Sequence, residues 1–163
     1  MAEPALRLGF TRISPTHHRF EFRRPDGTGE AVELETRGGL VHDLIHLAVE
    51  SEAGLRGSFY GLLAKIGGYE ELVVNGGAAL GGEVAITERV VGALTGAMTD
   101  EDLDAEPFVA RVTEFLDIYE ERAPRWFTAD FVLAVRERMR RLMGRWKATP
   151  FGETMQLTFP LET

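Results

Sequence analysis

The chain contains no cysteine, and its apolar residues are never gathered into one long run. Without thiols it cannot form disulfides, bind zinc through thiolates or use a cysteine nucleophile. A stretch of about 18 uncharged apolar residues, the length that marks a membrane-spanning helix, is also missing. The first residues lack the basic segment followed by an apolar segment that is typical of a secretory signal peptide. We therefore expect a cytoplasmic protein with no membrane partner.

Positive charge is scarce, with 18 Lys and Arg against 26 Asp and Glu, and the formal net charge is −8. Phosphate binding requires a basic surface, so a nucleic-acid partner is not expected. Only the C-terminal part is basic, through the arginines between Arg136 and Arg145. We interpret these arginines as a solvated helix face, or as a face that matches the acidic helix expected before it.

The order of hydrophobic patterns predicts one α+β domain over residues 1–163. Alternating apolar residues at 6–10, 18–22 and 32–34 predict an antiparallel meander, with a hairpin turn at 25–29. From Gly38 the apolar period changes to that of a helix, and about five helices are expected in the middle of the chain. A last alternation at 154–159 predicts a strand that joins the N-terminal meander in a small antiparallel sheet. A short strand is expected at 70–74, followed by a glycine-rich connector over 75–82.

Polar side chains recur every four residues in the first expected helix, from about Gly39 to Ala53. His42, His46 and Glu50 lie within about one quarter of the helix circumference, and Asp43 lies beside them. Two histidines at i and i+4 can reach one metal ion. We therefore predict that His42, His46 and Glu50 are ligands of a divalent metal such as zinc.

The same arc of the helix has a second interpretation. Apolar residues fill the other side of this helix, so its polar residues could simply form the remaining face, with Asp43 bonded to a histidine or to an arginine such as Arg37. Two functions stay open: a divalent-metal-binding protein with hydrolase activity as its extension, or a non-catalytic small-ligand or protein-interaction module without metal. In either, the partner would be a small molecule or a peptide, and the pattern predicts no oligomeric state.

The segment from His42 to His46 resembles the His-Glu-x-x-His signature of zincin metallopeptidases, with Asp43 in place of the glutamate. The resemblance implies that His42 and His46 bind zinc and that Asp43 acts as the general base. A further ligand completes the site in zincins. Here it would be a downstream glutamate. Glu83 and Glu88 belong to a later helix, but nothing in their spacing selects either one, and Glu50 is the local candidate, one turn past His46.

A longer pattern, His-Asp-Leu-x-His followed by Val-Glu, Gly-Leu and Phe-x-Gly between residues 42 and 61, is similar to a group of small bacterial proteins of unassigned function. This resemblance implies a strand-rich beginning and a helical middle over most of the chain. It implies no activity.

His18 is the other notable histidine. Strand alternation places it on the same face as Phe20 and Phe22, so we expect it to be buried near the helices.

Overall fold

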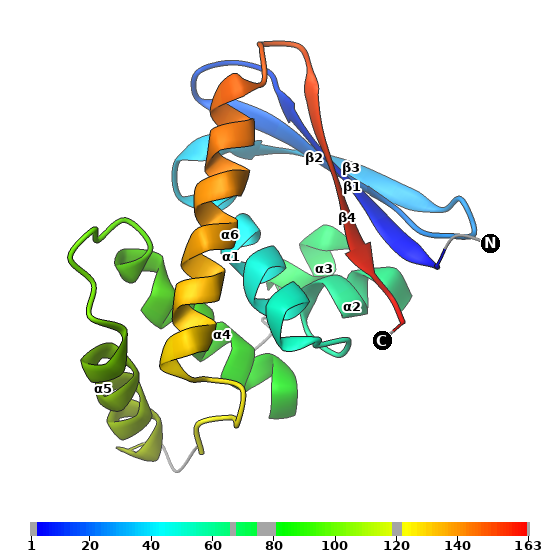
Figure 1. Ribbon diagram of the computed structural model, residues 1–163. Coiled ribbons are helices and arrows are strands. Elements are labelled where there is room, and N and C mark those ends of the chain that lie inside the picture. The colour runs from blue at the N-terminus through cyan, green and yellow to red at the C-terminus, as the bar shows by residue number, and fades with distance from the viewer. Residues whose placement is uncertain (1–2, 66–67, 75–80, 119–121, 163) are drawn as a thin grey trace.

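The computed structural model describes residues 3–65, 68–74, 81–118 and 122–162 of the chain (Figure 1). Its four strands form one sheet in the order β3-β2-β1-β4, and every neighbouring pair is antiparallel. The α+β class is confirmed, as is the pairing of the C-terminal strand with the N-terminal meander. The strands are β1 (Ala5–Arg12), β2 (His17–Arg23), β3 (Gly29–Glu35) and β4 (Thr154–Pro160).

Six helices lie in the part of the chain that the structure describes, and they gather on one side of the sheet (Figure 1). None of these helices is long and apolar enough to cross a membrane. They are α1 (Thr36–Ala53), α2 (Phe59–Lys65), α3 (Tyr69–Val74), α4 (Gly82–Ala97), α5 (Ala105–Ile118) and α6 (Ala129–Ala148).

Helix α3 corrects the short strand expected at 70–74. Tyr69 and Leu72 stand three residues apart and both pack against the core, which is helical spacing. Glu70 and Glu71 lie in the first turn, where the helix dipole favours negative charge. Most of the predicted connector that follows, residues 75–80, lies outside the described residues.

The register of β3 agrees with the alternation in the sequence. Val32 and Leu34 are half-buried against the core, whereas Glu33 and Glu35 are exposed. A slip of one residue would reverse the two sets and place the glutamates on the apolar side.

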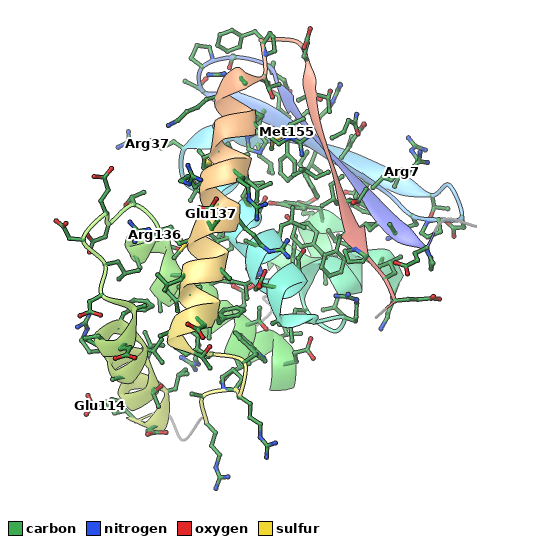
Figure 2. The ribbon with its side chains drawn as sticks, viewed as in Figure 1. Arg7, Arg37, Glu114, Arg136, Glu137 and Met155 are labelled. Carbon is green, nitrogen blue, oxygen red and sulfur yellow. The ribbon has the colours of Figure 1, made fainter. Side chains whose placement is uncertain are left out.

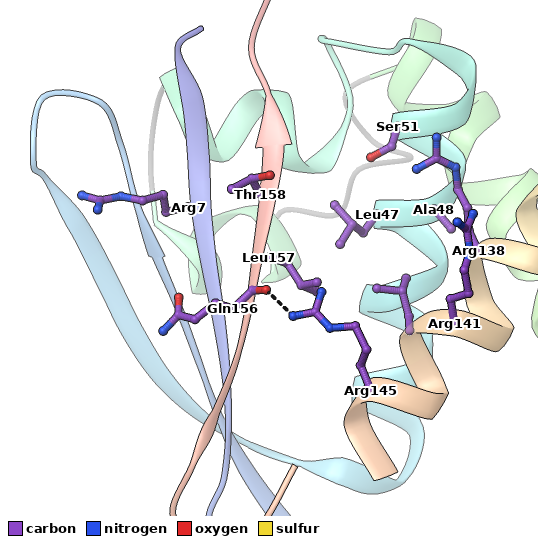
Figure 3. A pocket seen from close by; sticks show the side chains of 11 residues that line it. Arg7, Leu47, Ala48, Ser51, Arg138, Arg141, Arg145, Gln156, Leu157 and Thr158 are labelled. Carbon is purple, nitrogen blue, oxygen red and sulfur yellow. Dashed lines mark hydrogen bonds between the residues drawn. The ribbon is translucent and has the colours of Figure 1, made fainter. Parts of the chain in front are cut away.

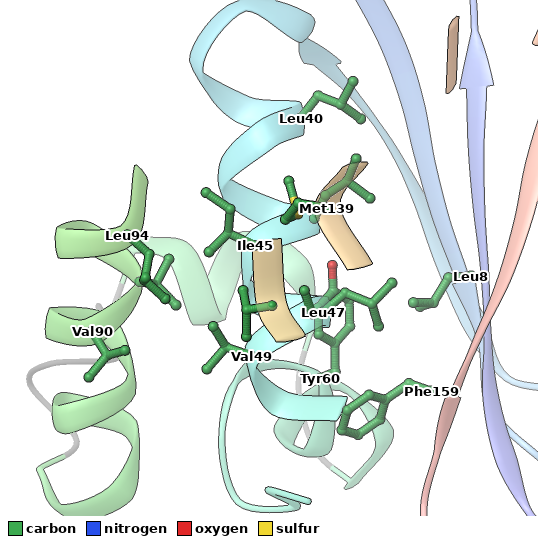
Figure 4. Packing of buried hydrophobic residues seen from close by; sticks show 14 of the residues in the cluster. Leu8, Leu40, Ile45, Leu47, Val49, Tyr60, Val90, Leu94, Met139 and Phe159 are labelled. Carbon is green, nitrogen blue, oxygen red and sulfur yellow. The ribbon is translucent and has the colours of Figure 1, made fainter. Parts of the chain in front are cut away.

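Helix α1 is the central element of the fold. Arg37 and Gly38 have non-helical torsion angles, so the regular helix begins at Gly39, and it ends at Gly54, whose φ is 68° and whose N–H donates to the carbonyl of Glu50. The predicted bounds of about Gly39 to Ala53 agree with this helix. Apolar residues of α1 pack against the sheet, α4 and α6 (Figure 4).

Charged side chains such as Arg7 and Glu114 lie at the periphery of the molecule, and Met155 lies inside, between the sheet and the helices (Figure 2). Helix α1 departs from this separation, because its polar arc is covered by neighbouring helices. Asp43, His46 and Glu50 are only 4%, 1% and 0% exposed. Buried polar groups need partners, and the partners of these three residues define the candidate site.

Candidate metal centre

His42 and His46 of α1 meet Glu88 of α4. One ligand atom from each of the three residues lies within 4.8 Å of the other two. The Nε2 atom of His46 is 3.1 Å from Glu88 Oε1, and the Nε2 atom of His42 is 3.9 Å from Glu88 Oε2. Two imidazoles and one carboxylate form a donor set that suits a divalent ion. This group could hold a metal.

Glu88 reaches the histidines because α4 packs along α1. Val84, Thr87 and Val91 belong to the buried stripe of α4, and Glu88 stands next to Val84 and Val91 on the helix surface. From the sequence alone, Glu88 was a possible ligand, but its spacing did not favour it over Glu83. The sequence signal that could have favoured Glu88 is its position at the edge of the apolar stripe of α4.

Glu83, the other downstream glutamate, has a different position. Its Oε1 atom accepts hydrogen bonds from the N–H of Gly57 and the hydroxyl of Ser58, each at 3.0 Å. It therefore joins the start of α4 to the turn before α2 and does not belong to the histidine group.

Glu50, predicted as a ligand, lies on the other side of the His46 ring. Its Oε2 atom is 3.0 Å from Nδ1 of His46, and its Oε1 atom accepts the N–H of Tyr60 at 3.0 Å. Both carboxylate oxygens are occupied by these contacts. The structure thus brings His42 and His46 together with Glu88, and it places Glu50 behind His46.

Asp43, predicted as the general base, has a similar position behind His42. Its Oδ1 atom is 3.6 Å from Nδ1 of His42, and its Oδ2 atom accepts the hydroxyl of Tyr69 at 3.1 Å. Tyr60 donates its hydroxyl to the backbone carbonyl of Asp43 at 2.7 Å, which fixes this turn of α1. Each histidine therefore has a carboxylate beside Nδ1 and turns Nε2 toward Glu88.

The charges of the group are strongly coupled. Burial alone would lower the pKa of His46, but Glu50 and Glu88 together outweigh it and raise that pKa to about 9. Burial would raise the pKa of Glu88, yet His46 and His42 hold it below its ordinary value. Burial raises the pKa of Glu50 against the opposing effects of His46 and the Tyr60 N–H. Without metal, His46 is therefore protonated at neutral pH.

The contact between His46 and Glu88 is an ion pair rather than a good hydrogen bond. Although the two atoms are 3.1 Å apart, Nε2 of His46 is buried without a hydrogen-bond partner of acceptable geometry. Nε2 of His18 is also buried without a partner, so the unused nitrogen of His46 indicates a metal ligand only because Nε2 of His42 and the carboxylate of Glu88 lie beside it.

The dimensions of the group fit a zinc-like ion. Zn–N distances of 2.0–2.1 Å place neighbouring ligand atoms roughly 3.3 Å apart in a tetrahedron, so a small closing movement would be needed. The side chain of His42 is 41% exposed and that of Glu88 is 27% exposed, whereas His46 is held in place by Glu50. Solvent therefore reaches the group on the side of His42 and Glu88.

Comparisons of this chain with models of protein families, with curated proteins and with solved structures found no match. The zincin-like and bacterial resemblances of the sequence remain predictions.

Proposed function

We propose that this chain is a divalent-metal-binding protein that holds a zinc-like ion through Nε2 of His42, Nε2 of His46 and the carboxylate of Glu88. The convergence of both Nε2 atoms on Glu88 is the observation that supports it. Three protein ligands and a partly exposed side are typical of zinc sites that keep one position open for water or substrate.

Asp43 and Glu50 have a positioning role in this proposal. Histidine ligands generally donate the other ring N–H to a carboxylate or a carbonyl, which fixes the tautomer and the orientation of the ring. Glu50 Oε2 is placed to accept the Nδ1–H of His46 at 3.0 Å, and Asp43 lies beside Nδ1 of His42 at 3.6 Å, which is longer than a hydrogen bond. From the sequence, these two residues were expected to be a ligand and the base. All four residues expected from the sequence have a role in this proposal, but Asp43 and Glu50 act through the two histidines.

Hydrolysis of a small molecule or peptide is the activity that fits an open site of this kind. A bound ion would supply a Lewis acid and a water of lowered pKa. The chain itself would hold His46 rigidly through Glu50 and present the exposed side of His42 to a substrate. For Asp43 to serve as the base, its carboxylate would have to leave Tyr69 and pass to the Nε2 side of His42.

A metal-free structural role is the competing function, and one observation favours it. The Glu88 carboxylate already lies within 3.9 Å of both Nε2 atoms, so the group can act as a charged clamp between α1 and α4. The protein would then be an interaction module whose histidines stabilise the fold.

Calorimetric titration with zinc distinguishes the two functions. Untagged, metal-free protein should bind one equivalent, and Glu88→Gln should weaken binding at least about 100-fold because a direct ligand is lost. Glu83→Gln is the matched control on the same helix, and its affinity should equal that of the wild type. If the wild type binds no zinc below about 1 mM, or if the two variants behave alike, the metal function is wrong.

A further inference from the structure

A second site lies on another side of α1. A cavity of about 530 Å³ lies between α6 and β4, and residues of α1 also line it (Figure 3). This volume is within the range of small-molecule sites in proteins. The apolar part of its lining consists of Leu47 and Ala48 of α1, Leu142 of α6 and Leu157 of β4.

The charged residues that line this cavity all have the same sign. Arg138, Arg141 and Arg145 of α6 border it, and among the described residues its lining includes no Asp or Glu, although the chain has 26 acidic residues and only 18 basic ones. Arg7 also contributes to the lining, but its side chain extends away from the cavity (Figure 3). The three α6 arginines therefore give the cavity a cationic border.

Two of these arginines have weak or replaceable partners. Arg141 lies 4.0 Å from Glu137, and both side chains are about half exposed or more, so water and salt screen this pair. Arg138 pairs with Glu52 at the surface of α1. Neither contact buries its arginine, and a guanidinium can bind a carboxylate or phosphate through two hydrogen bonds.

The third arginine, Arg145, contacts β4, an edge strand of the sheet. Arg145 donates to the backbone carbonyl of Gln156 at 2.9 Å, across the cavity (Figure 3). Strand β4 is the last strand of the sheet and pairs only with β1 among the described strands. In an antiparallel ladder the N–H and C=O of one residue point to the same side, so the N–H of Gln156 also faces the cavity. It adds a donor to the three guanidinium groups.

We propose that this cavity binds an amphipathic organic anion, with its carboxylate or phosphate head at Arg141 and Arg145 and its hydrocarbon body on Leu47, Leu142 and Leu157. The cationic border favours an anion over a cation or a neutral ligand. The apolar part of the lining favours a ligand with a hydrocarbon portion over a bare inorganic ion. This site does not depend on metal binding by His42 and His46.

Titration with matched probes tests the two halves of the ligand. Octanoate and octyl phosphate should bind at least about tenfold more tightly than octanol, which lacks the charge, or inorganic phosphate, which lacks the chain. The ratio between the two octyl anions shows which head group the arginines prefer. Inorganic phosphate that binds as tightly as octyl phosphate would overturn the proposal.

Variants locate the binding. Arg141→Gln should weaken octyl phosphate binding about tenfold, because one charge-assisted contact is lost. Ser51→Phe, which places a bulky side chain in the cavity without changing the charge, should weaken octyl phosphate binding by a similar factor. Arg136→Gln removes the same charge from a residue of α6 that does not line the cavity and should leave affinity within about twofold. Equal effects of Arg136→Gln and Arg141→Gln, or no binding of either octyl anion below about 1 mM, would refute the site.

Discussion

Two buried histidines of this protein have opposite surroundings. His18 and His46 are 0% and 1% exposed. The ring of His18 lies among aromatic side chains, with ring centroids 6.2 Å from Phe10 and 6.0 Å from Trp146, and its Nδ1 atom is 3.1 Å from the hydroxyl of Thr36. His46 lies instead between the carboxylates of Glu50 and Glu88.

Burial alone therefore does not distinguish a candidate metal ligand from a packing histidine. Burial lowers the pKa of His18 and outweighs the raising effect of Asp43, so this ring is neutral at pH 7 and serves packing. The two carboxylates raise the pKa of His46 to about 9 although it is buried as deeply. Perturbed groups with specific charged partners mark candidate sites, and of this pair only His46 is in direct contact with carboxylates.

Exchange of each histidine gives the largest expected difference. His46→Gln should weaken zinc binding at least about 100-fold, because it removes a ligand that we place at the centre of the group. His18→Gln should leave zinc affinity within about twofold, since His18 has no part in that group. Calorimetric titration of both variants measures this, with circular dichroism to confirm that each is folded. An equal loss in both variants would remove the distinction between the two histidines.

Glu50→Gln separates a positioning residue from a ligand. The amide of glutamine cannot accept from both Tyr60 N–H and His46 Nδ1–H, so it favours the tautomer that carries its proton on Nε2. Zinc affinity should fall about 10–100-fold, which is less than for His46→Gln. If Glu50→Gln weakens zinc binding as much as His46→Gln, Glu50 is a direct ligand, as the sequence suggested.

Zinc affinity should depend on pH over an unusual range. The ion must displace the proton of His46, whose pKa is raised to about 9, so affinity should rise about tenfold per pH unit up to that value. With an ordinary histidine pKa of about 6.5 the increase would end near neutrality. Titration in two buffers of different ionisation enthalpy should show release of about one proton at pH 7. Affinity that is constant above pH 7 would contradict the raised pKa.

The stability of the metal-free protein gives the smallest and most specific difference. His46 has a raised pKa, so its stabilising contribution is complete below about pH 6.5 and is lost as pH rises through about 9. His18 has a lowered pKa, so its contribution is present above about pH 6.5 and is lost as pH falls through its folded-state pKa.

Urea unfolding with a chelator present, at pH values from 5 to 9, measures both effects. His46→Gln should flatten the decline of unfolding free energy on the alkaline side, and His18→Gln should flatten the decline on the acidic side. If both variants leave the decline of unfolding free energy unchanged, that decline comes from other titrating groups.

Local patterns predicted the parts of the structure that depend on local geometry. The i, i+4 spacing was sufficient to place His42 and His46 side by side, with ring centroids 4.8 Å apart. Alternation likewise predicted the burial of His18 and the register of Val32 and Leu34 in β3. In these cases one element and its period determine where a side chain points.

The remaining parts of the site depend on packing between elements. Glu88 is 42 positions after His46, and only the contact of α4 with α1 brings them together. Glu50 shares an arc of the helix with the histidines, as predicted, but the N–H of Tyr60 from α2 holds its carboxylate behind His46. No local pattern could indicate which neighbouring helix covers a polar face or which of its groups lies there.

Anomalous X-ray diffraction at the zinc absorption edge, on crystals of protein loaded with one equivalent of zinc, tests the central claim most directly. We predict one strong peak about 2.0–2.1 Å from Nε2 of both His42 and His46, with a Glu88 oxygen as the third protein ligand and Glu50 still bonded to Nδ1 of His46. A peak bound by Glu50, a peak at another histidine such as His17, or no ordered zinc would contradict it.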